Sequence, residues 1–312
     1  MSRLRTLATT RERPIITAEF PSIDGGNLDT VKAKLDPILP FVDGINATDN
    51  PAAHAHASNV AIAIALKTLG AEPIMQVVCR DKNRLAAQAD IVGAALFGVT
   101  NICALTGDDV TAGDEPQSRR VFDLDGPSLV KVATGIGEGH YISGRAIKPA
   151  PDLFVGAVET PFGPPQHYRV ERARIKADAG ARFLQLQIGY QPELLESFMA
   201  GVVANGVAAR TAILPSICLT KTARALNFMN ESVAGITVPQ AVRDRITKAS
   251  DIPEESYQLT LELAQHALSL NGVAGIHITD FRHDGSFTRL ISDLGLDTSA
   301  PRESASPQHA PA

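Results

Sequence analysis

The chain of 312 residues has no tryptophan, only three cysteines and few aromatic residues, which make up 5% of the sequence. It also lacks an excess of positive charge, because 29 Lys and Arg stand against 34 Asp and Glu, for a net charge of -5. A protein that neutralises a nucleic-acid backbone or an anionic membrane carries a basic surface. The composition therefore argues against both partners and favours small-molecule substrates.

No apolar run approaches the roughly 20 residues that a membrane-spanning helix needs, and the first 13 residues contain no apolar signal core. The cysteines, Cys79, Cys103 and Cys218, are odd in number and widely spaced, which favours neither a disulfide framework nor a structural zinc site. These absences predict a cytoplasmic protein. The oligomeric state stays open, and a homo-oligomer is compatible with the sequence.

Both ends of the chain are poor in residues that could anchor a fold. Residues 1–13 are polar and basic, and residues 297–312 contain no apolar run. The sequence therefore predicts a flexible N-terminus over 1–13, one folded catalytic domain over 14–296 and a disordered C-terminal tail over 297–312.

Short β-branched runs alternate with longer segments of helical periodicity between these ends, which is typical of parallel βα units. Most runs begin about 30 residues apart, the length of one strand, one helix and two loops. Strands are predicted over Ile15–Glu19, Val42–Asn46, Ile74–Cys79, Asn101–Leu105, Leu153–Val158, Phe183–Gln187, Thr211–Ser216 and Val273–Ile278. Eight such units predict a single-domain (β/α)₈ TIM barrel. A doubly wound open sheet is the alternative, but the Gly-rich turn that usually follows its first strand is missing.

Capping residues place helices between the predicted strands. Asn50 and Pro51 offer an N-cap and a first-turn proline for a helix that ends at Gly70. Further helices are predicted over 84–98, Gln166–Asp178 and Asp251–Leu270.

Polar side chains gather at the predicted carboxyl ends of the strands, where TIM-barrel enzymes place their chemistry. Glu19 ends the first strand before Phe20 and Pro21, so shielding from water is expected to raise the pKa of its carboxyl group, as a general acid requires. The alternative for Glu19 is an ion pair with an arginine that closes the barrel mouth. Asp108 follows Gly107 in a tight turn and is expected to stay ionised and to accept hydrogen bonds.

Alternation along the sixth strand puts Gln185 and Gln187 on one face and the leucines beside them on the other. A glutamine inside a barrel must find hydrogen-bond partners. We interpret Gln185 as part of a satisfied interior layer and Gln187 as a ligand contact near the mouth. Asp109, beside Asp108, is interpreted as the cap of a turn or helix.

Seven ordered segments resemble the methylenetetrahydrofolate reductase family over roughly residues 15–290. They are AEFPS around Glu19, DGINATDNP at 43–51, IMQVVCRD at 74–81, ALTGDD at 104–109, DLFVGAVETP at 152–161, ADAGARFLQLQ at 177–187 and ILPSI at 213–217. The resemblance implies a TIM-barrel flavoprotein that reduces 5,10-methylenetetrahydrofolate to 5-methyltetrahydrofolate for methionine synthesis. In that family NADH or NADPH supplies the hydride through bound FAD.

The resemblance also implies roles for individual residues. Glu19 resembles the acid that protonates N10, Asp108 resembles the aspartate beside flavin and pterin, and Gln187 resembles the glutamine that hydrogen-bonds the pterin. The residues implied in cofactor binding are Asn46, Thr48, Gln76, Thr106, Gly107, Asp108, Asp125, Gly126 and Lys176.

The sequence departs from the best-known bacterial members, which have a histidine, an arginine and a tyrosine where Gln76, Thr106 and Val158 stand here. A flavin-free reductase that passes hydride directly from NADH to folate is therefore an alternative, as is a folate- or flavin-binding partner subunit without turnover. The same residues are compatible with the reverse reaction, the oxidation of 5-methyltetrahydrofolate. A metal-dependent lyase or a Schiff-base aldolase is disfavoured, because the sequence shows no metal-ligand cluster and no strand-end lysine.

Overall fold

The computed structural model describes residues 1–233 and 235–296 and contains a closed barrel of parallel strands in the order β1 to β8. The strands are β1 (Ile15–Glu19), β2 (Gly44–Ala47), β3 (Pro73–Val78), β4 (Asn101–Leu105), β5 (Phe154–Glu159), β6 (Phe183–Ile188), β7 (Ala212–Leu219) and β8 (Gly275–Asp280). The predicted TIM barrel is confirmed, and every predicted strand overlaps an observed one. The predicted C-terminal tail lies outside the described residues.

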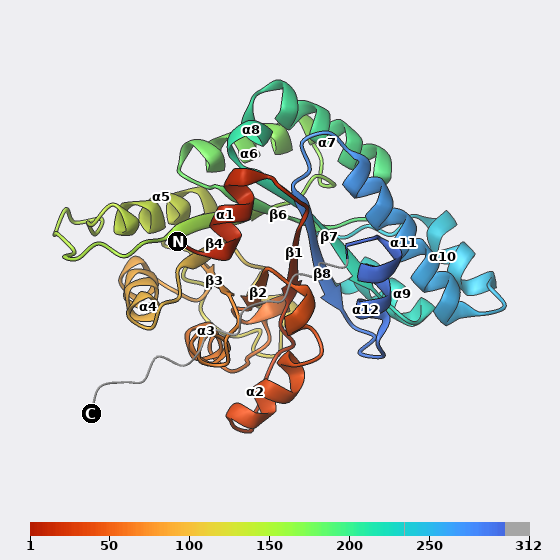
Figure 1. Ribbon diagram of the computed structural model, residues 1–312, viewed down its shortest axis with the longest axis horizontal. Helices are drawn as coiled ribbons and strands as arrows, with labels where there is room; N and C mark the ends of the chain where they lie inside the picture. Colours follow the sequence, from red (N-terminus) through yellow and green to blue (C-terminus); the bar gives the residue numbers. More distant parts are fainter. Residues whose placement is uncertain (234, 297–312) are drawn as a thin grey trace.

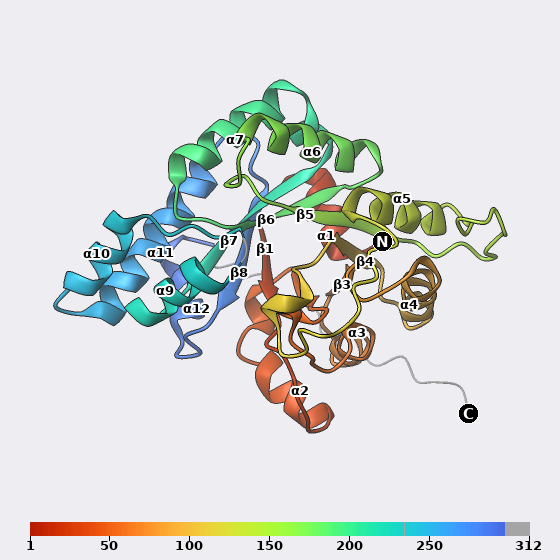
Figure 2. The same ribbon diagram turned by 180° about the vertical axis from the view of Figure 1, so that it is seen from behind.

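Helices surround the strands on the outside of the barrel (Figure 1 and Figure 2). They are α1 (Arg3–Thr10), α2 (Leu28–Leu35), α3 (Asn59–Thr68), α4 (Arg84–Leu96), α5 (Gly126–Gly137), α6 (Gln166–Asp178), α7 (Pro192–Ala204), α8 (Val207–Arg210), α9 (Ala223–Ser232), α10 (Gln240–Lys248), α11 (Ile252–Ser269) and α12 (Ser286–Asp293). None of these helices is both long and apolar enough to cross a membrane.

Three of the predicted helices are confirmed as α4, α6 and α11, but the helix predicted from Pro51 begins later. Asn50 adopts a left-handed conformation with φ 47° and leads only into a 3₁₀ turn over Pro51–Ala53. The N-cap of α3 is Ser58 instead, because its side chain accepts the N–H of Ala61 at 3.3 Å. A serine eight residues downstream therefore starts the helix.

Strand register divides the barrel interior into layers. Thr17 on β1 pairs with His277 on β8, and Glu19 pairs with Asn46 on β2. Because side chains alternate along a strand, Ile15, Thr17 and Glu19 share the inward face of β1. The interior consequently passes from an apolar layer at the amino end, through a polar layer, to the mouth at the carboxyl end.

Helix α1 closes the amino end of the barrel, so the prediction of a flexible N-terminus was wrong for this segment. The helix lies in front of the strands in Figure 1 and behind them in Figure 2. Leu4 is fully buried and Leu7 is 3% exposed. Both belong to the interior apolar cluster that also contains Ile15, Ile74, Cys103, Phe154, Phe183, Ala212, Leu214 and Ala274.

Polar contacts hold α1 in place beside this apolar contact. The N-cap Ser2 donates its hydroxyl to Asn101 Oδ1 at 2.7 Å, and Arg5 donates to the backbone oxygen of Leu153 at 2.6 Å. The Arg5 guanidinium also lies 5.6 Å from the centre of the Phe154 ring. These contacts reach β4 and the start of β5, so α1 is an integral part of the fold.

Replacing Leu4 tests this packing. Leu4→Ala should lower the free energy of unfolding by about 2–5 kcal/mol, because it leaves a cavity beneath the barrel. The control is Leu85→Ala, because Leu85 is 75% exposed on α4 and its truncation should change stability by less than about 0.5 kcal/mol. Urea unfolding of both variants measures the difference, and equal stabilities would show that α1 is not packed as described.

Candidate active site

A closed polar layer fills the middle of the barrel. Asn46 and Gln185 form a reciprocal amide pair, in which Asn46 Nδ2 donates to Gln185 Oε1 at 2.9 Å and Gln185 Nε2 donates to Asn46 Oδ1 at 3.0 Å. His277 completes the layer, with Nδ1 at 2.9 Å from Thr17 Oγ1 and 3.2 Å from Gln185 Nε2. The interpretation of Gln185 as a satisfied interior residue is thus confirmed.

This layer carries no charge near neutral pH. Burial lowers the pKa of His277 to about 3, because the charged imidazolium would lose its hydration inside the barrel. The other three residues are an alcohol and two amides. The floor beneath the mouth is therefore polar but neutral.

Glu19 lies at the mouth on the same face of β1 as Thr17. Its side chain is part-exposed, next to the buried Phe20, and it makes no hydrogen bond or ion pair with any residue that the structure describes. Burial raises the pKa of its carboxyl group to about 7, since little water and no cation stabilises the carboxylate. The raised pKa that the sequence predicts agrees with this burial, whereas no arginine among the described residues pairs with Glu19.

Asp108 follows β4 on another side of the mouth. The turn depends on Gly107, whose φ is 91° and where an added Cβ would lie 2.7 Å from Val78 Cγ1. Burial raises the pKa of Asp108, and the positive charge of Arg80 opposes this shift. Arg80 also donates to the backbone oxygen of Asp108 at 3.3 Å. An adjacent arginine thus favours the ionised form of Asp108.

Asp109 has the capping role that the sequence predicts. It is the N-cap of the 3₁₀ turn over Val110–Ala112 and accepts the N–H of Thr111 at 2.9 Å. Arg120 donates to its carboxylate at 2.5 Å and 2.6 Å. The two neighbouring aspartates therefore differ, because Asp109 is exposed and paired with Arg120 while Asp108 is half-buried beside Arg80.

Gln187 stands at the carboxyl end of β6, where the register with β7 shifts between Gln185 and Ile188. Its Oε1 accepts the N–H of Ile188 at 2.9 Å. Its Nε2 lies toward the segment after α9, at 3.9 Å from the position that a Cβ on Gly235 would take. Glu19, Asp108 and Gln187 thus stand at the same end of the barrel, on β1, after β4 and on β6.

A family model for methylenetetrahydrofolate reductase matches residues 33–295, which is most of the chain. The chain belongs to the methylenetetrahydrofolate reductase family. A curated relative, "Probable methylenetetrahydrofolate reductase (NADPH)" of Caenorhabditis elegans, is 23% identical over 237 residues. That match covers 73% of this chain and 33% of the relative, so this chain spans about a third of the relative's length.

Solved structures share the barrel. An uncharacterised protein from Clostridium thermocellum, described as binding two copies of 5-methyl-5,6,7,8-tetrahydrofolic acid, has a TM-score of 0.66 and 16% identity, with 95% of this chain and 100% of that chain covered. EDTA monooxygenase from Chelativorans sp. BNC1 has a TM-score of 0.53 and 9% identity, with coverages of 95% and 96%. At these identities the likeness shows the fold alone.

The cofactor contacts that the family resemblance implies lie in two places. Asn46 belongs to the interior layer, while Gln76 on β3 and Thr48 after β2 are buried. Thr106, Gly126 and Lys176 meet where β4, α5 and α6 converge, because an added Cβ on Gly126 would lie 3.3 Å from Thr106 Oγ1 and 3.9 Å from Lys176 Cε. Gly107 and Asp108 follow in the turn after β4, and Asp125 is the residue before Gly126. Their assignment to a cofactor stays a prediction.

The polar groups of this second set are bonded to other groups of the protein. Lys176 Nζ donates to the backbone oxygen of Val158 at 2.6 Å and to Glu159 Oε2 at 2.5 Å. Thr106 Oγ1 accepts the N–H of Gly126 at 3.2 Å. Asp125 is the N-cap of α5, and its side chain accepts an N–H of the first helical turn at 2.9 Å.

Two arginines that the sequence analysis did not single out surround the same carboxylate. Arg169 and Arg172 lie 3.9 Å and 3.6 Å from the Glu159 carboxylate oxygens, so this buried group faces three cations. Arg169, Arg172 and Lys176 follow each other at i, i+3 and i+7, which puts all three on one face of α6. That spacing was a visible signal in the sequence.

The raised pKa of Glu19 makes a prediction about stability. Between the ordinary pKa of 4.5 and about 7, the carboxyl ionises in the unfolded chain but keeps its proton in the folded one, so stability falls as pH rises through this window. Glu19→Gln has no such proton to lose. Its Tm should match that of the wild type at about pH 4 and exceed it at about pH 8.

Thermal unfolding across this pH range measures the effect. Glu12→Gln is the matched control, because Glu12 is exposed and lies three residues before the start of β1. The difference in Tm between Glu12→Gln and the wild type should not change with pH. A Glu19→Gln variant that is less stable than the wild type at every pH would show that the carboxylate has a stabilising partner.

Proposed function

We propose that this chain reduces 5,10-methylenetetrahydrofolate to 5-methyltetrahydrofolate with hydride from NADH or NADPH. The observation that carries the proposal is Glu19 at the barrel mouth, a carboxyl group with no partner in the part of the chain that the structure describes, whose pKa burial raises to about 7. At neutral pH a carboxyl group with this pKa is protonated in about half of the molecules, and it releases its proton readily, as a general acid must. Membership of the reductase family supports this assignment.

The protonated Glu19 would donate to N10 of the substrate. The bond between N10 and the methylene carbon then breaks with its electron pair going to N10, which leaves an iminium cation on N5. Hydride from the nicotinamide adds to the methylene carbon, and the nicotinamide is oxidised. The carboxylate of Asp108 would stabilise the developing positive charge, and Gln187 would hydrogen-bond the pterin.

The tetrahydrofolate ligand of the structural neighbour also supports a folate site. The Clostridium thermocellum protein, which shares the barrel fold, is described as binding two copies of 5-methyl-5,6,7,8-tetrahydrofolic acid. The name of the Caenorhabditis elegans relative includes NADPH. For this chain we propose a tetrahydrofolate as the substrate and a nicotinamide nucleotide as the hydride donor.

Two of the residues implied in FAD binding, Asn46 and Lys176, already have partners within the protein. Asn46 has both of its amide atoms engaged by Gln185, and Lys176 has Glu159 and Val158 as partners. A flavin would have to displace these bonds, and a buried donor or acceptor left behind is costly. The Asn46–Gln185 and Lys176–Glu159 pairs therefore favour the flavin-free reaction, in which the nicotinamide transfers its hydride directly to the folate.

Replacing the acid tests the catalytic role. Glu19→Gln should lower the rate of methylenetetrahydrofolate reduction by about 10²–10⁴-fold, which is the usual contribution of a general acid. Binding of 5-methyltetrahydrofolate, measured by calorimetry, should change little. Glu12→Gln should retain wild-type turnover.

The pH profile gives a second readout of the same role. The wild-type kcat/KM should fall about tenfold per pH unit above a pH of about 7, because only the protonated form of Glu19 donates. If Glu19→Gln loses folate binding and turnover to the same extent, Glu19 holds the substrate and another group is the acid.

The absorption spectrum of the purified protein distinguishes the two forms of the reaction. We expect no visible flavin absorbance, together with oxidation of NADH or NADPH on addition of methylenetetrahydrofolate without added flavin. A yellow protein that bleaches under anaerobic conditions with 5-methyltetrahydrofolate would restore bound FAD.

A further inference from the structure

Arg80 is a large charged side chain that lies almost entirely inside the protein, with 2% of its surface exposed. It follows β3 by two residues, and its N–H donates to the backbone oxygen of Thr106 at 3.1 Å. Its own backbone oxygen accepts the N–H of Val121 at 2.9 Å. An arginine is rarely buried unless its charge is paired, so the partners of this side chain indicate what it does.

The guanidinium of Arg80 joins three loops at the carboxyl end of the barrel. Its Nη1 donates to the backbone oxygen of Asp108 after β4 at 3.3 Å, and its Nη2 donates to the backbone oxygen of Asn50 after β2 at 3.0 Å. Its Nε and Nη2 also donate to the two carboxylate oxygens of Asp81, at 2.7 Å and 2.6 Å. The planar fork of an arginine makes such bonds in fixed directions. One side chain thus sets the loops after β2, β3 and β4 relative to one another.

The backbone of these loops adopts conformations that need support. Asn50 has a φ of 47° and Gly107, before Asp108, has a φ of 91°. Such conformations persist where the surrounding structure fixes them. The side chain of Asn50 adds a bond of 3.2 Å from its Nδ2 to Asp81 Oδ2. Arg80 therefore supports the turn that carries Asp108 together with the neighbouring turn after β2.

Arg80 is also the cation that acts on the Asp108 carboxyl group. Burial raises the pKa of this group, and among the described residues the charge of Arg80 opposes the shift. Arg80 itself faces the negative charges of Asp81, Asp108 and Asp49. Asp81 is bonded to Arg80, and Asp49 accepts a bond of 2.7 Å from Lys82 Nζ. The Asp108 carboxylate thus depends on the charge of Arg80 without a direct bond to it.

We propose that Arg80 is a positioning residue for the reaction, which fixes Asp108 at the site as a carboxylate. The proposal rests on the proposed function, in which the Asp108 carboxylate stabilises the iminium cation formed when Glu19 donates its proton. That step needs one carboxyl group protonated and the other ionised at the same pH. Arg80 meets the second condition through its charge, and it fixes the place of the carboxylate through its bond to the Asp108 backbone.

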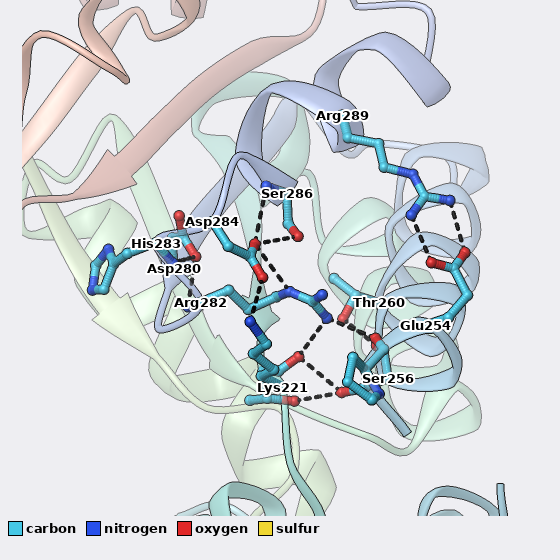
Figure 3. Close-up of polar contacts among 12 residues, drawn as sticks. Lys221, Glu254, Ser256, Thr260, Asp280, Arg282, His283, Asp284, Ser286 and Arg289 are labelled. Carbon is cyan, nitrogen blue, oxygen red and sulfur yellow. Dashed lines mark hydrogen bonds and ion pairs between the residues drawn. The ribbon is translucent and has the colours of Figure 1, made fainter. Parts of the chain in front are cut away.

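A second arginine anchors a loop elsewhere at the same end of the barrel and offers a matched control. The side chain of Arg282, after β8, is 7% exposed and donates to the backbone oxygen of Thr220, after β7, at 3.0 Å. Figure 3 shows it pointing toward Asp284, which lies 3.4 Å from it. Arg282 therefore joins loops as Arg80 does, but its charge does not act on Asp108.

The pH dependence of turnover separates the charge of Arg80 from its structural contribution. Loss of an adjacent positive charge raises the pKa of a carboxyl group, so Arg80→Gln should lose kcat/KM progressively as the pH falls. The ratio of its kcat/KM to the wild-type value should decrease about tenfold or more between about pH 7 and about pH 5. Arg80→Lys keeps the charge without the fork, and Arg282→Gln loses the other loop anchor. Both should give a ratio that does not change with pH, although all three variants should have a lower Tm than the wild type.

Titration of Asp108 itself tests the charge without turnover. In protein labelled with ¹³C at the aspartate carboxyl groups, the Asp108 signal is the one that Asp108→Asn removes. This signal should titrate at a higher pH in Arg80→Gln than in the wild type. In Arg282→Gln it should titrate as in the wild type.

The two measurements have outcomes that would overturn the proposal. A protonated Asp108 in the wild type at about pH 7 would do so without any variant, even if Arg80→Gln does not fold. A loss of kcat/KM by the same factor at every pH in Arg80→Gln and Arg282→Gln would show that Arg80 is a structural anchor only. If the Asp108 signal shifts as expected but the wild type reduces no methylenetetrahydrofolate, the proposed function is refuted while the action of Arg80 on Asp108 stands.

Discussion

The reciprocal amide pair between Asn46 and Gln185 is the interaction on which the site depends. It joins β2 to β6 across the barrel and uses both polar atoms of each side chain. Because His277 stays neutral beside it, the mouth has a floor that satisfies its own hydrogen bonds and carries no charge. Burial raises the pKa of Glu19, and this neutral floor supplies no cation that would oppose the shift.

The two carboxyl groups of the mouth differ because their surroundings differ. At Asp108 the charge of Arg80 opposes the effect of burial, whereas at Glu19 only burial acts. One fold can place an acid and an ionised group in the same site by such a difference in environment. The cations of α6 add to the contrast, because they surround Glu159 on the side of the barrel formed by β5 and β6.

The sequence predicted the parts of this structure that depend on periodicity. Alternation located the strands and the inward face of β6, and the apolar segment around Glu19 predicted its raised pKa. Features set by distant partners were not predicted. Leu4 and Leu7 stand in a basic segment of the sequence, and they are buried only because residues from six strands and Ala274 form the apolar cluster that receives them. Ser58 rather than Asn50 caps the helix because the residues after Asn50 form their own turn. The pairing of Lys176 with Glu159 likewise requires β5 and α6 to be packed together.

The position of α1 has a consequence for how the chain assembles. The helix precedes every strand, yet the apolar cluster that receives it contains residues from Ile15 to Ala274. Its binding surface is complete only when β8 has closed the barrel against β1. During synthesis α1 must therefore remain undocked until nearly the whole chain has been made, and its insertion beneath the strands belongs among the last steps of folding.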